Sequence, residues 1–278
     1  MGEHALLDRY ETWLLASDRS GTTITLRMRH ARDLASRMDV LTATVDDVEA
    51  LMAKRRHLAA ETRKSQLASW RVLFGWAHRR GLRPDDPTID IGSIRVPTRL
   101  PKVAPDAAVE GALAGASTRD RALVLLARYG LLRLEELTSL PLSARDGDAL
   151  RFIGKGNKER TIKANQPLLF ALHAQEREVL SLDPRERFYF PGAVDGHLHK
   201  MSVNKIITRV VGWNPHSLRH AGATAAYRAT GDIRAVQAML GHASLATTQR
   251  YLHLDDESMR RVAEATAIKP ARLGLVAA

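Results

Sequence analysis

Apolar residues recur every three or four positions through most of this chain, a spacing that predicts amphipathic helices rather than strands. Between two such stripes, Thr44 and Asp47 have the three-residue spacing of a helix capping box. Residues 1–92 are therefore predicted to form a helical domain. The first stripe, in residues 21–38, comprises Ile24, Met28, Ala31, Leu34, Ala35 and Met38. The second, in residues 61–81, ends at Gly81 and comprises Leu67, Trp70, Leu73, Phe74 and Ala77.

Proline breaks this pattern between the two halves of the chain, because it removes a backbone donor and clashes with the preceding helical turn. We expect residues 93–104 to be an extended linker, followed by a second domain over residues 105–278. A chain of 278 residues has the length of two typical domains. The prolines that break the pattern lie between residues 83 and 105, and they are Pro84, Pro87, Pro97, Pro101 and Pro105.

Helical spacing returns in the second half, with one interruption. Ser117 is expected to cap a helix that stops at Gly130. Two short apolar or β-branched runs then flank the sequence GKGNKE, residues 154–159, which is typical of a β-hairpin. The predicted fold class is mainly α: a helical N-terminal domain, then a mixed, mostly helical domain with a small β-hairpin or sheet. Its further helices are expected around residues 165–180, 202–212, 216–229, 232–240, 244–252 and 255–267.

The charge balance adds a partner to this picture. Lys and Arg exceed Asp and Glu by 42 to 31, a net charge of +11, which favours a polyanionic partner such as DNA, RNA or an acidic membrane surface. No apolar run approaches the roughly 18 residues that a membrane span requires. The first residues also lack the pattern of a signal peptide. With no cysteine, the chain has no disulfide and no thiolate metal site. From the excess of positive charge, nucleic acid is the expected partner.

Four segments of the second half carry candidate chemistry: GLLRLEEL, the hairpin, HSLRH (residues 216–220) and LGHASLATTQRYLHL. Taken singly, each has an ordinary interpretation as a surface arginine, a solvated turn lysine or a half-buried tyrosine. HSLRH also lacks the glutamate of a zinc-protease helix, which disfavours a metal site. The candidate residues in these segments are Arg133, Lys155, His216, Arg219, His242 and Tyr251.

Together these residue types fit one reaction, attack on a phosphodiester without a metal ion. The pentavalent transition state carries extra negative charge, and guanidinium groups stabilise it because their fork matches two oxygens. A lysine whose pKa is lowered by nearby arginines can protonate the leaving alkoxide. A phenol that loses its proton to a neighbouring base can attack phosphorus and form a covalent phosphotyrosine. That bond conserves the energy of the broken one, so rejoining needs no ATP.

The order and spacing of these segments resemble those of the tyrosine recombinase family, which includes the lambda-type integrases and the Xer recombinases. The family's first arginine motif is matched by Leu132, Arg133, Glu136 and Leu137. Its hairpin lysine is matched by Lys155, and its H-x-x-R box by His216 and Arg219. Its L-G-H box is matched by Leu240, Gly241 and His242, and its nucleophile, nine residues later, by Tyr251. The linker phrase LPKV, residues 100–103, is also similar to the family's entry into its catalytic domain.

The resemblance implies a role for each matched residue. Arg133, Arg219 and His242 would bind the scissile phosphate. Lys155 would protonate the departing 5′ oxygen, and Tyr251 would take the 3′ phosphate of the DNA.

Neighbouring positions have supporting roles. His216 would be a general base or a positioning donor, and Glu136 would orient an arginine or form a plain helix salt bridge. His220 is left over, and is expected to be structural or to contact the DNA backbone. One position departs from the family pattern, because Leu131 stands where the family usually has glycine and Gly130 comes one residue earlier. If the turn requires a positive φ, leucine is poorly suited to it.

The resemblance also implies how the protein would work. Residues 1–92 would be a core-binding domain and residues 105–278 the catalytic domain, and the two would clamp double-stranded DNA at core-type recombination sites. A homotetramer on two DNA sites would exchange strands through a Holliday junction, without cofactor, metal or ATP. An accessory directionality protein is a possible further partner, and no arm-type domain is expected before the first helix. The expected location is the bacterial cytoplasm, at the nucleoid and away from membranes, for a host or phage-encoded protein.

Three classes of function remain open. The first is a site-specific recombinase, either a phage or mobile-element integrase or, alternatively, a Xer-type resolvase of chromosome or plasmid dimers. The second is a type IB topoisomerase, which would relax a supercoiled plasmid that carries no recombination site. The third is a DNA-binding regulator without catalysis, which the six filled chemical positions disfavour. The linker phrase, the helical N-terminal domain and the His-to-Tyr spacing favour the recombinase over the topoisomerase. Between the two kinds of recombinase, the integrase is the first expectation and the Xer-type resolvase the alternative.

Overall fold

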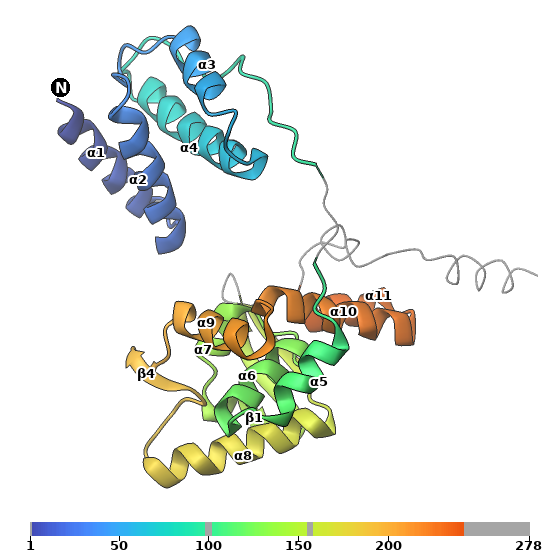
Figure 1. Ribbon diagram of the computed structural model, residues 1–278. Helices are drawn as coiled ribbons and strands as arrows, with labels where there is room; N and C mark the ends of the chain where they lie inside the picture. Colours follow the sequence, from blue (N-terminus) through green and yellow to red (C-terminus); the bar gives the residue numbers. More distant parts are fainter. Residues whose placement is uncertain (1, 98–101, 155–157, 242–278) are drawn as a thin grey trace, which may run out of the picture. The chain divides into compact units, whose positions relative to one another are not determined.

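The structure is a computed structural model, and it describes residues 2–97, 102–154 and 158–241. The chain divides into two compact units, Met1–Arg99 and Leu100–Ala278 (Figure 1). Both units are mainly helical, and the second contains a small antiparallel sheet, so the predicted fold class is confirmed. The boundary falls within the proline-rich segment, while the functional roles assigned to residues 1–92 and 105–278 stay predictions.

The described part of the first unit is a group of helices around one apolar core. Helix α2 lies against both α1 and α4. The capping box is confirmed, because Thr44 Oγ1 accepts from the Asp47 N–H at 3.3 Å and Asp47 Oδ2 accepts from the Thr44 N–H at 2.9 Å. The helices are α1 (Glu3–Ala16), α2 (Gly21–Ala35), α3 (Val45–Lys54) and α4 (Ala60–Arg79). As the two apolar stripes predict, the buried residues include Met28, Leu34, Trp70, Leu73 and Phe74.

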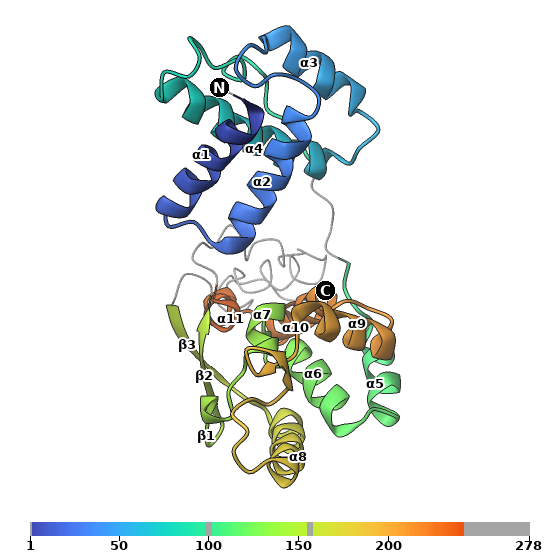
Figure 2. The same ribbon diagram turned by 90° about the vertical axis from the view of Figure 1, so that its left-hand side faces the viewer.

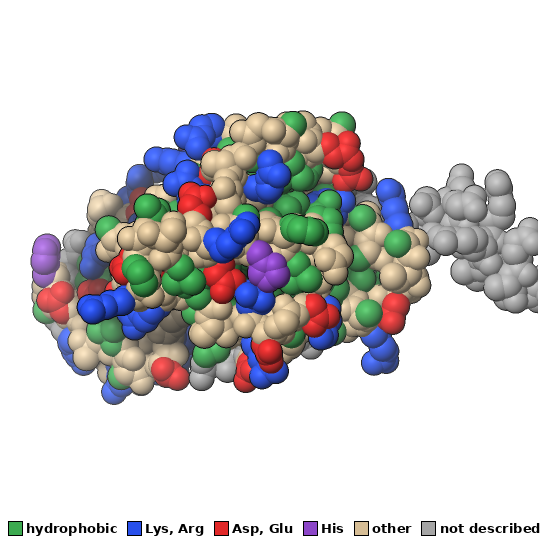
Figure 3. Space-filling view, turned by 90° about the horizontal axis from the view of Figure 1, so that it is seen from below, with side chains coloured by type: hydrophobic (Ala, Val, Ile, Leu, Met, Phe, Trp, Pro, Cys, Tyr) green, Lys and Arg blue, Asp and Glu red, His purple; other side chains and the backbone are tan. Residues whose placement is uncertain are grey.

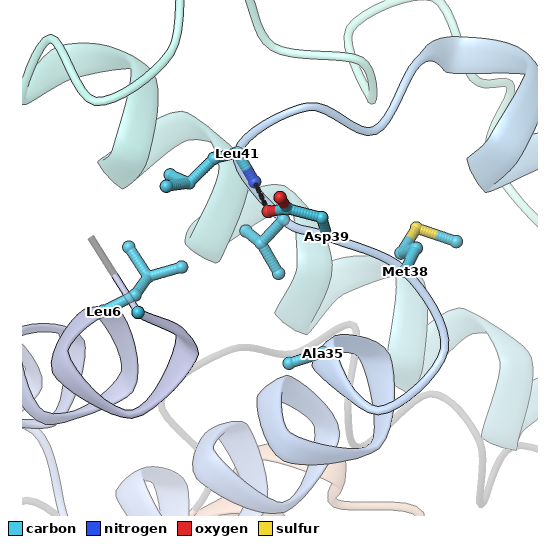
Figure 4. Close-up of a pocket in the computed structure, with 7 residues that line it drawn as sticks. Leu6, Ala35, Met38, Asp39 and Leu41 are labelled. Atoms are coloured by element: carbon cyan, nitrogen blue, oxygen red, sulfur yellow. Dashed lines mark hydrogen bonds between the residues drawn. The ribbon is translucent and has the colours of Figure 1, made fainter.

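A hollow of about 380 Å³ in the first unit lies between the start of α1 and the turn after α2 (Figure 4). Asp39 is the one ionisable residue of its lining, and Asp39 Oδ1 already accepts the backbone N–H of Leu41 at 2.8 Å. This lining offers apolar contact but not the clustered charges that phosphate chemistry uses. The lining residues are Gly2, Leu6, Ala35, Met38, Asp39, Val40 and Leu41.

Helix α6 (Thr118–Arg128) is the centre of the second unit and lies against α8, α9 and α10 (Figure 1). Ser117 caps this helix as predicted, with Ser117 Oγ accepting the Asp120 N–H at 3.2 Å. The four helices expected between residues 165 and 240 are confirmed, whereas those at 244–252 and 255–267 lie outside the described residues. The other elements of this helical layer are α5 (Asp106–Ala114), α7 (Leu134–Thr138), the 3-10 turn η1 (Leu142–Ala144), α8 (Gln166–Leu182), α9 (Lys200–Val211), α10 (Pro215–Thr230) and α11 (Ile233–Leu240).

The predicted hairpin consists of β2 (Ala149–Gly154) and β3 (Lys158–Lys163), with the short β1 (Arg145–Asp146) on the other edge of β2. The pairing is antiparallel and sets Phe152 opposite Arg160. Figure 2 shows this sheet on one side of the second unit and α5 on the other. The elements α5, α7 and β4 (Pro191–Val194) were not predicted. Helix α7 and strand β4 contain too few residues to show a clear periodicity.

Two glycines allow backbone segments to approach closely at the end of α6. The helix ends at Arg128, two residues before the stop expected at Gly130. Gly130 is required by contact rather than by φ, because a Cβ there would lie 2.8 Å from the Leu126 carbonyl oxygen. On α10, a Cβ at Gly222 would lie 1.9 Å from the Arg128 carbonyl oxygen. The helix that carries HSLRH is therefore pressed directly against the end of α6.

We expect Gly222→Ala to destabilise the second unit by about 3 kcal/mol, since the added methyl group forces α10 away from α6. The matched control is Gly111→Ala in α5, where a Cβ would meet nothing within 4 Å. That substitution should stabilise the helix by roughly 0.5–1 kcal/mol. Urea unfolding measures both. A Gly222→Ala protein as stable as wild type would contradict the close packing of α10.

Candidate active site

The predicted arginine motif forms the first turn of α7, around a buried carboxylate. Arg133 is the N-cap residue, and its backbone N–H donates to Glu136 Oε2 at 2.7 Å. The other carboxylate oxygen, Oε1, accepts from Arg133 Nη1 at 3.0 Å. The Glu136 side chain is only 4% exposed, so these bonds form away from bulk water, where they are stronger than at the surface.

Three guanidinium groups surround this one carboxylate. Besides Arg133, Arg160 from β3 donates through Nη2 to Glu136 Oε2 at 2.6 Å, and Arg219 Nη1 from α10 lies 4.0 Å from the same oxygen. Glu136 is therefore more than the plain helix salt bridge that its spacing allows. Three positive charges face one negative charge, which leaves an excess of two. An excess of guanidinium charge in a partly buried site is what binding of a phosphate anion requires.

The same three arginines also bind the end of α11. Arg160 Nη1 donates to the Met239 carbonyl, Arg219 Nη2 to the Leu240 carbonyl at 2.7 Å, and Arg133 Nη2 to the Gly241 carbonyl at 3.0 Å. The last carbonyls of a helix lack partners within the helix and carry its partial negative charge, so cations are favourable there. The arginines thus fix the residue that directly precedes His242 in the sequence.

The departure from the family pattern at Leu131 coincides with an unusual backbone. Leu131 has φ +53°, so the turn does require a positive φ and leucine adopts it. A left-handed conformation of a non-glycine residue costs on the order of 1–3 kcal/mol. Burial of the side chain, which packs with Ala223, Val236 and Leu240, offsets a similar amount. Its carbonyl accepts from Arg219 Nη1, so the strained turn contributes to holding that arginine.

The two histidines of HSLRH contact each other across one turn of α10. Their Nε2 atoms are 2.7 Å apart and their ring centroids 4.1 Å apart, so one imidazole donates a proton and the other accepts it. Packing of protein atoms around His216 and the charge of Arg219 lower the pKa of the His216 imidazole. The lowered pKa favours a neutral ring that can accept a proton. His220, which sequence analysis left without a chemical role, is the buried partner in this pair.

Three of the six predicted site residues are described: Arg133, His216 and Arg219. The structure brings Arg133 and Arg219 together at Glu136 and places His216 in the first turn of the helix that carries Arg219. The other three lie outside the described residues, and their roles stay predictions: Lys155, His242 and Tyr251.

Arg160 was not predicted as a site residue from the sequence. A signal for it exists in the alternation of β3, where Ile162 is buried and Arg160, two residues earlier, faces the same side of the sheet. A charged residue at an inward position of a strand requires a buried partner. The pattern could not say that this partner is Glu136, because the contact joins residues 24 positions apart.

Other features of the described residues bear on the choice of chemistry. No group of three or more His, Asp or Glu side chains among them could hold a metal ion. Among the same residues, no helix is both long enough and apolar enough to cross a membrane. On the face shown in Figure 3, Lys and Arg side chains are interspersed with acidic and apolar ones. The cluster at Glu136 is a more concentrated source of positive charge.

Known proteins match this chain in sequence and in fold. A sequence model of the Phage integrase family matches residues 106–258. The tyrosine recombinase XerC of Alcanivorax borkumensis is 33% identical and the match covers 93% of each chain. The tyrosine recombinase XerD of Yersinia pestis is 30% identical over 81% of this chain and 82% of its own. A lambda integrase dimer bound to a COC′ core site has a similar fold, with a TM-score of 0.74 at 16% identity over 91% of this chain and 77% of that one.

Glu136→Gln keeps the shape of the side chain but leaves three guanidinium groups around a neutral amide. We expect the free energy of unfolding of the second unit to fall by about 3–5 kcal/mol in a urea titration. The matched control is Glu135→Gln in the same helix. Glu135 is exposed, and its ion pair with Lys200, at 3.5 Å, lies at the surface. That change should stay within about 0.5 kcal/mol of wild type. Equal losses in both variants would show that Glu136 does not organise the arginines.

Proposed function

This chain belongs to the phage integrase family and is a tyrosine-type site-specific recombinase, and we propose that it cleaves and rejoins DNA through a 3′-phosphotyrosine at Tyr251. One observation supports this proposal above the others. The Arg133 and Arg219 side chains, from two different helices, converge on one buried carboxylate. Their combined positive charge exceeds its single negative charge. Charge of this kind, fixed before the reaction, stabilises the negative charge that develops on a phosphate under attack.

In the proposed reaction, Tyr251 Oη attacks the scissile phosphorus. The new Tyr–O–P bond forms as the bond between phosphorus and the 5′ oxygen breaks, and the 5′ oxygen takes the electron pair. Lys155 supplies the proton of the new 5′ hydroxyl. The phenolic proton goes to His216, which its lowered pKa keeps neutral and able to accept it. Attack by the 5′ hydroxyl of another strand reverses these steps and rejoins the DNA.

Arginine and histidine side chains would bind the two non-bridging oxygens. Arg133, with 31% of its side chain exposed, reaches the surface of the cluster, whereas Arg219 is 3% exposed and lies deeper. His242, the residue directly after the C-cap of α11 in the sequence, would add a further donor. The two described arginines are already oriented by Glu136 and the α11 carbonyls, so little reorganisation is needed when the phosphate binds.

Double-stranded DNA is the proposed substrate, and a homotetramer on two sites the proposed assembly. Residues 1–92 would form the core-binding domain and residues 105–278 the catalytic domain, the pair enclosing the duplex and exchanging strands through a Holliday junction. The reaction draws on no cofactor. The DNA-bound complexes of lambda integrase support a DNA partner by likeness of fold.

Two biological roles use this chemistry. We propose integration of a phage or mobile element first, and resolution of chromosome or plasmid dimers as the second candidate. Sequence similarity to the tyrosine recombinases XerC and XerD supports the second role. Substrate topology separates the two roles. A resolvase converts a plasmid with two directly repeated copies of one site into two circles, whereas an integrase joins two different sites.

Tyr251→Phe removes only the phenolic oxygen and leaves the ring and the arginine cluster around Glu136 in place. With a duplex site recovered by the wild-type protein from a random-sequence pool, the variant should bind normally and form no covalent adduct on a denaturing gel. Arg219→Ala should lower the rate of adduct formation about 10²–10³-fold, since it removes a preorganised cation. Tyr227→Phe, in α10, is the control and should form adduct like wild type. An adduct that persists in Tyr251→Phe would mean that another residue attacks.

A further inference from the structure

We propose that Arg160 is a positioning residue for strand cleavage, which holds the C-terminal turn of α11, the turn that directly precedes His242 in the sequence. This inference rests on the proposed function and deepens it. Arg160 lies on β3, five residues after Lys155 in the sequence, and it was not among the six candidate residues.

The Arg160 side chain is buried and held along its length. It is 10% exposed, and its guanidinium carbon lies 4.6 Å from the ring centroid of Phe152, the residue paired with it on β2. The sheet thus holds the backbone of Arg160 by strand pairing and its guanidinium group by contact with the Phe152 ring. A side chain restrained in this way loses little further entropy when it binds its acceptors.

The guanidinium group joins three separate parts of the second unit. Arg160 Nη2 donates to Glu136 Oε2 of α7 at 2.6 Å and to the Leu131 carbonyl at 3.4 Å, while Nη1 donates to the Met239 carbonyl of α11. Two of these acceptors, Glu136 and Leu131, also lie next to Arg219. Arg160 therefore connects the sheet to both the proposed phosphate-binding arginines and the end of α11.

Gly241 is matched to this arginine. It ends α11 with φ +62°, which alone favours glycine, but space is restricted as well. A Cβ at Gly241 would lie 2.9 Å from both Cδ and Nη1 of Arg160. The glycine of the L-G-H box thus allows the arginine to pass beside the helix end, and the arginine in turn closes that end.

These contacts assign Arg160 a positioning role rather than a catalytic one. Its Nη1 and Nη2 both donate to protein acceptors, and its side chain is largely buried, so these two nitrogens are already engaged within the protein rather than presented to DNA. A lysine would keep the charge but offers a single donor group, which cannot span Glu136 and Met239 with the geometry of a guanidinium fork. Arg160→Lys is therefore the informative substitution, because it separates fork geometry from charge.

The first experiment tests the contact without DNA. In Arg160→Lys, amide hydrogen exchange in the last turn of α11 should be tenfold faster or more than in wild type. The matched control is Arg151→Lys on β2, whose side chain is 58% exposed and pairs with exposed Asp146. It should leave exchange unchanged. Equal exchange in wild type and a folded Arg160→Lys protein would overturn the proposal.

The second experiment tests the consequence for cleavage of the selected duplex site. Arg160→Lys should lower the single-turnover rate of adduct formation tenfold or more while changing site affinity less than threefold. A parallel loss of affinity and rate would instead indicate a DNA contact and overturn the positioning role. Adduct formation at the wild-type rate would also overturn it. A wild-type protein that forms no adduct at all would overturn the proposed function, a separate result.

A substrate with a 5′-bridging sulfur shows whether the Arg160 variant is impaired at the lysine that protonates the leaving group or at the end of α11. Sulfur leaves without needing a proton, so this substrate should restore much of the rate of Lys155→Ala. It should not restore Arg160→Lys, because the defect lies at α11 rather than at the hairpin lysine. Rescue of Arg160→Lys would reject the α11 route.

Gly241→Ala tests the same contact with Arg160 still present, and serves if the lysine variant does not fold. The added methyl group should displace the arginine and lower the rate of adduct formation tenfold or more. In an Arg160→Ala background, which frees the space, Gly241→Ala should lower the rate less than in wild type. Equal effects in both backgrounds would overturn the match between the two residues.

Discussion

The arrangement of the second unit depends on one buried carboxylate. Glu136 accepts from the backbone of its own helix and lies among guanidinium groups of three different elements: α7, β3 and α10. A carboxylate buried to this extent is stable only when it is paired and hydrogen-bonded. The elements that supply its partners must therefore pack together, and the position of each arginine is set by the need to satisfy Glu136.

The same arginines meet the opposite requirement at the end of α11. Three successive carbonyls, Met239 to Gly241, each accept from a different guanidinium group, so arginine donors satisfy carbonyls that the helix itself leaves without partners. One carboxylate and the partial negative charge of the helix end, roughly half a unit, balance only about half of the three positive charges. The remaining positive charge suits a phosphate anion. The end of α11 that the arginines bind directly precedes His242 in the sequence. The contacts that pack α7, β3, α10 and α11 together are thus the same ones that orient the arginines for a phosphate.

The sequence predicted the parts of this arrangement that have a local signature. The stripes of α2 and α4, the capping box at Thr44 and the β2–β3 hairpin follow from spacing alone, and the motifs around Arg133 and HSLRH identified two of the clustered arginines. The remaining features are tertiary. Neither the contact of Arg160 with Glu136 nor the strained backbone of Leu131 has a periodic signal, since both depend on segments brought together by folding. The partnership of His216 and His220 was visible as a shared helix face, but not as a hydrogen bond.

The most direct test of this account is a double-mutant cycle between Glu136 and Arg160 in the free energy of unfolding. The cycle compares Glu136→Gln, Arg160→Lys and the double variant by urea titration. If the carboxylate organises the guanidinium groups, the two changes remove one shared interaction, and their effects should fall short of additivity by about 1.5–3 kcal/mol. Effects that add within about 0.5 kcal/mol would mean that the two residues act independently, and would contradict the central role of Glu136.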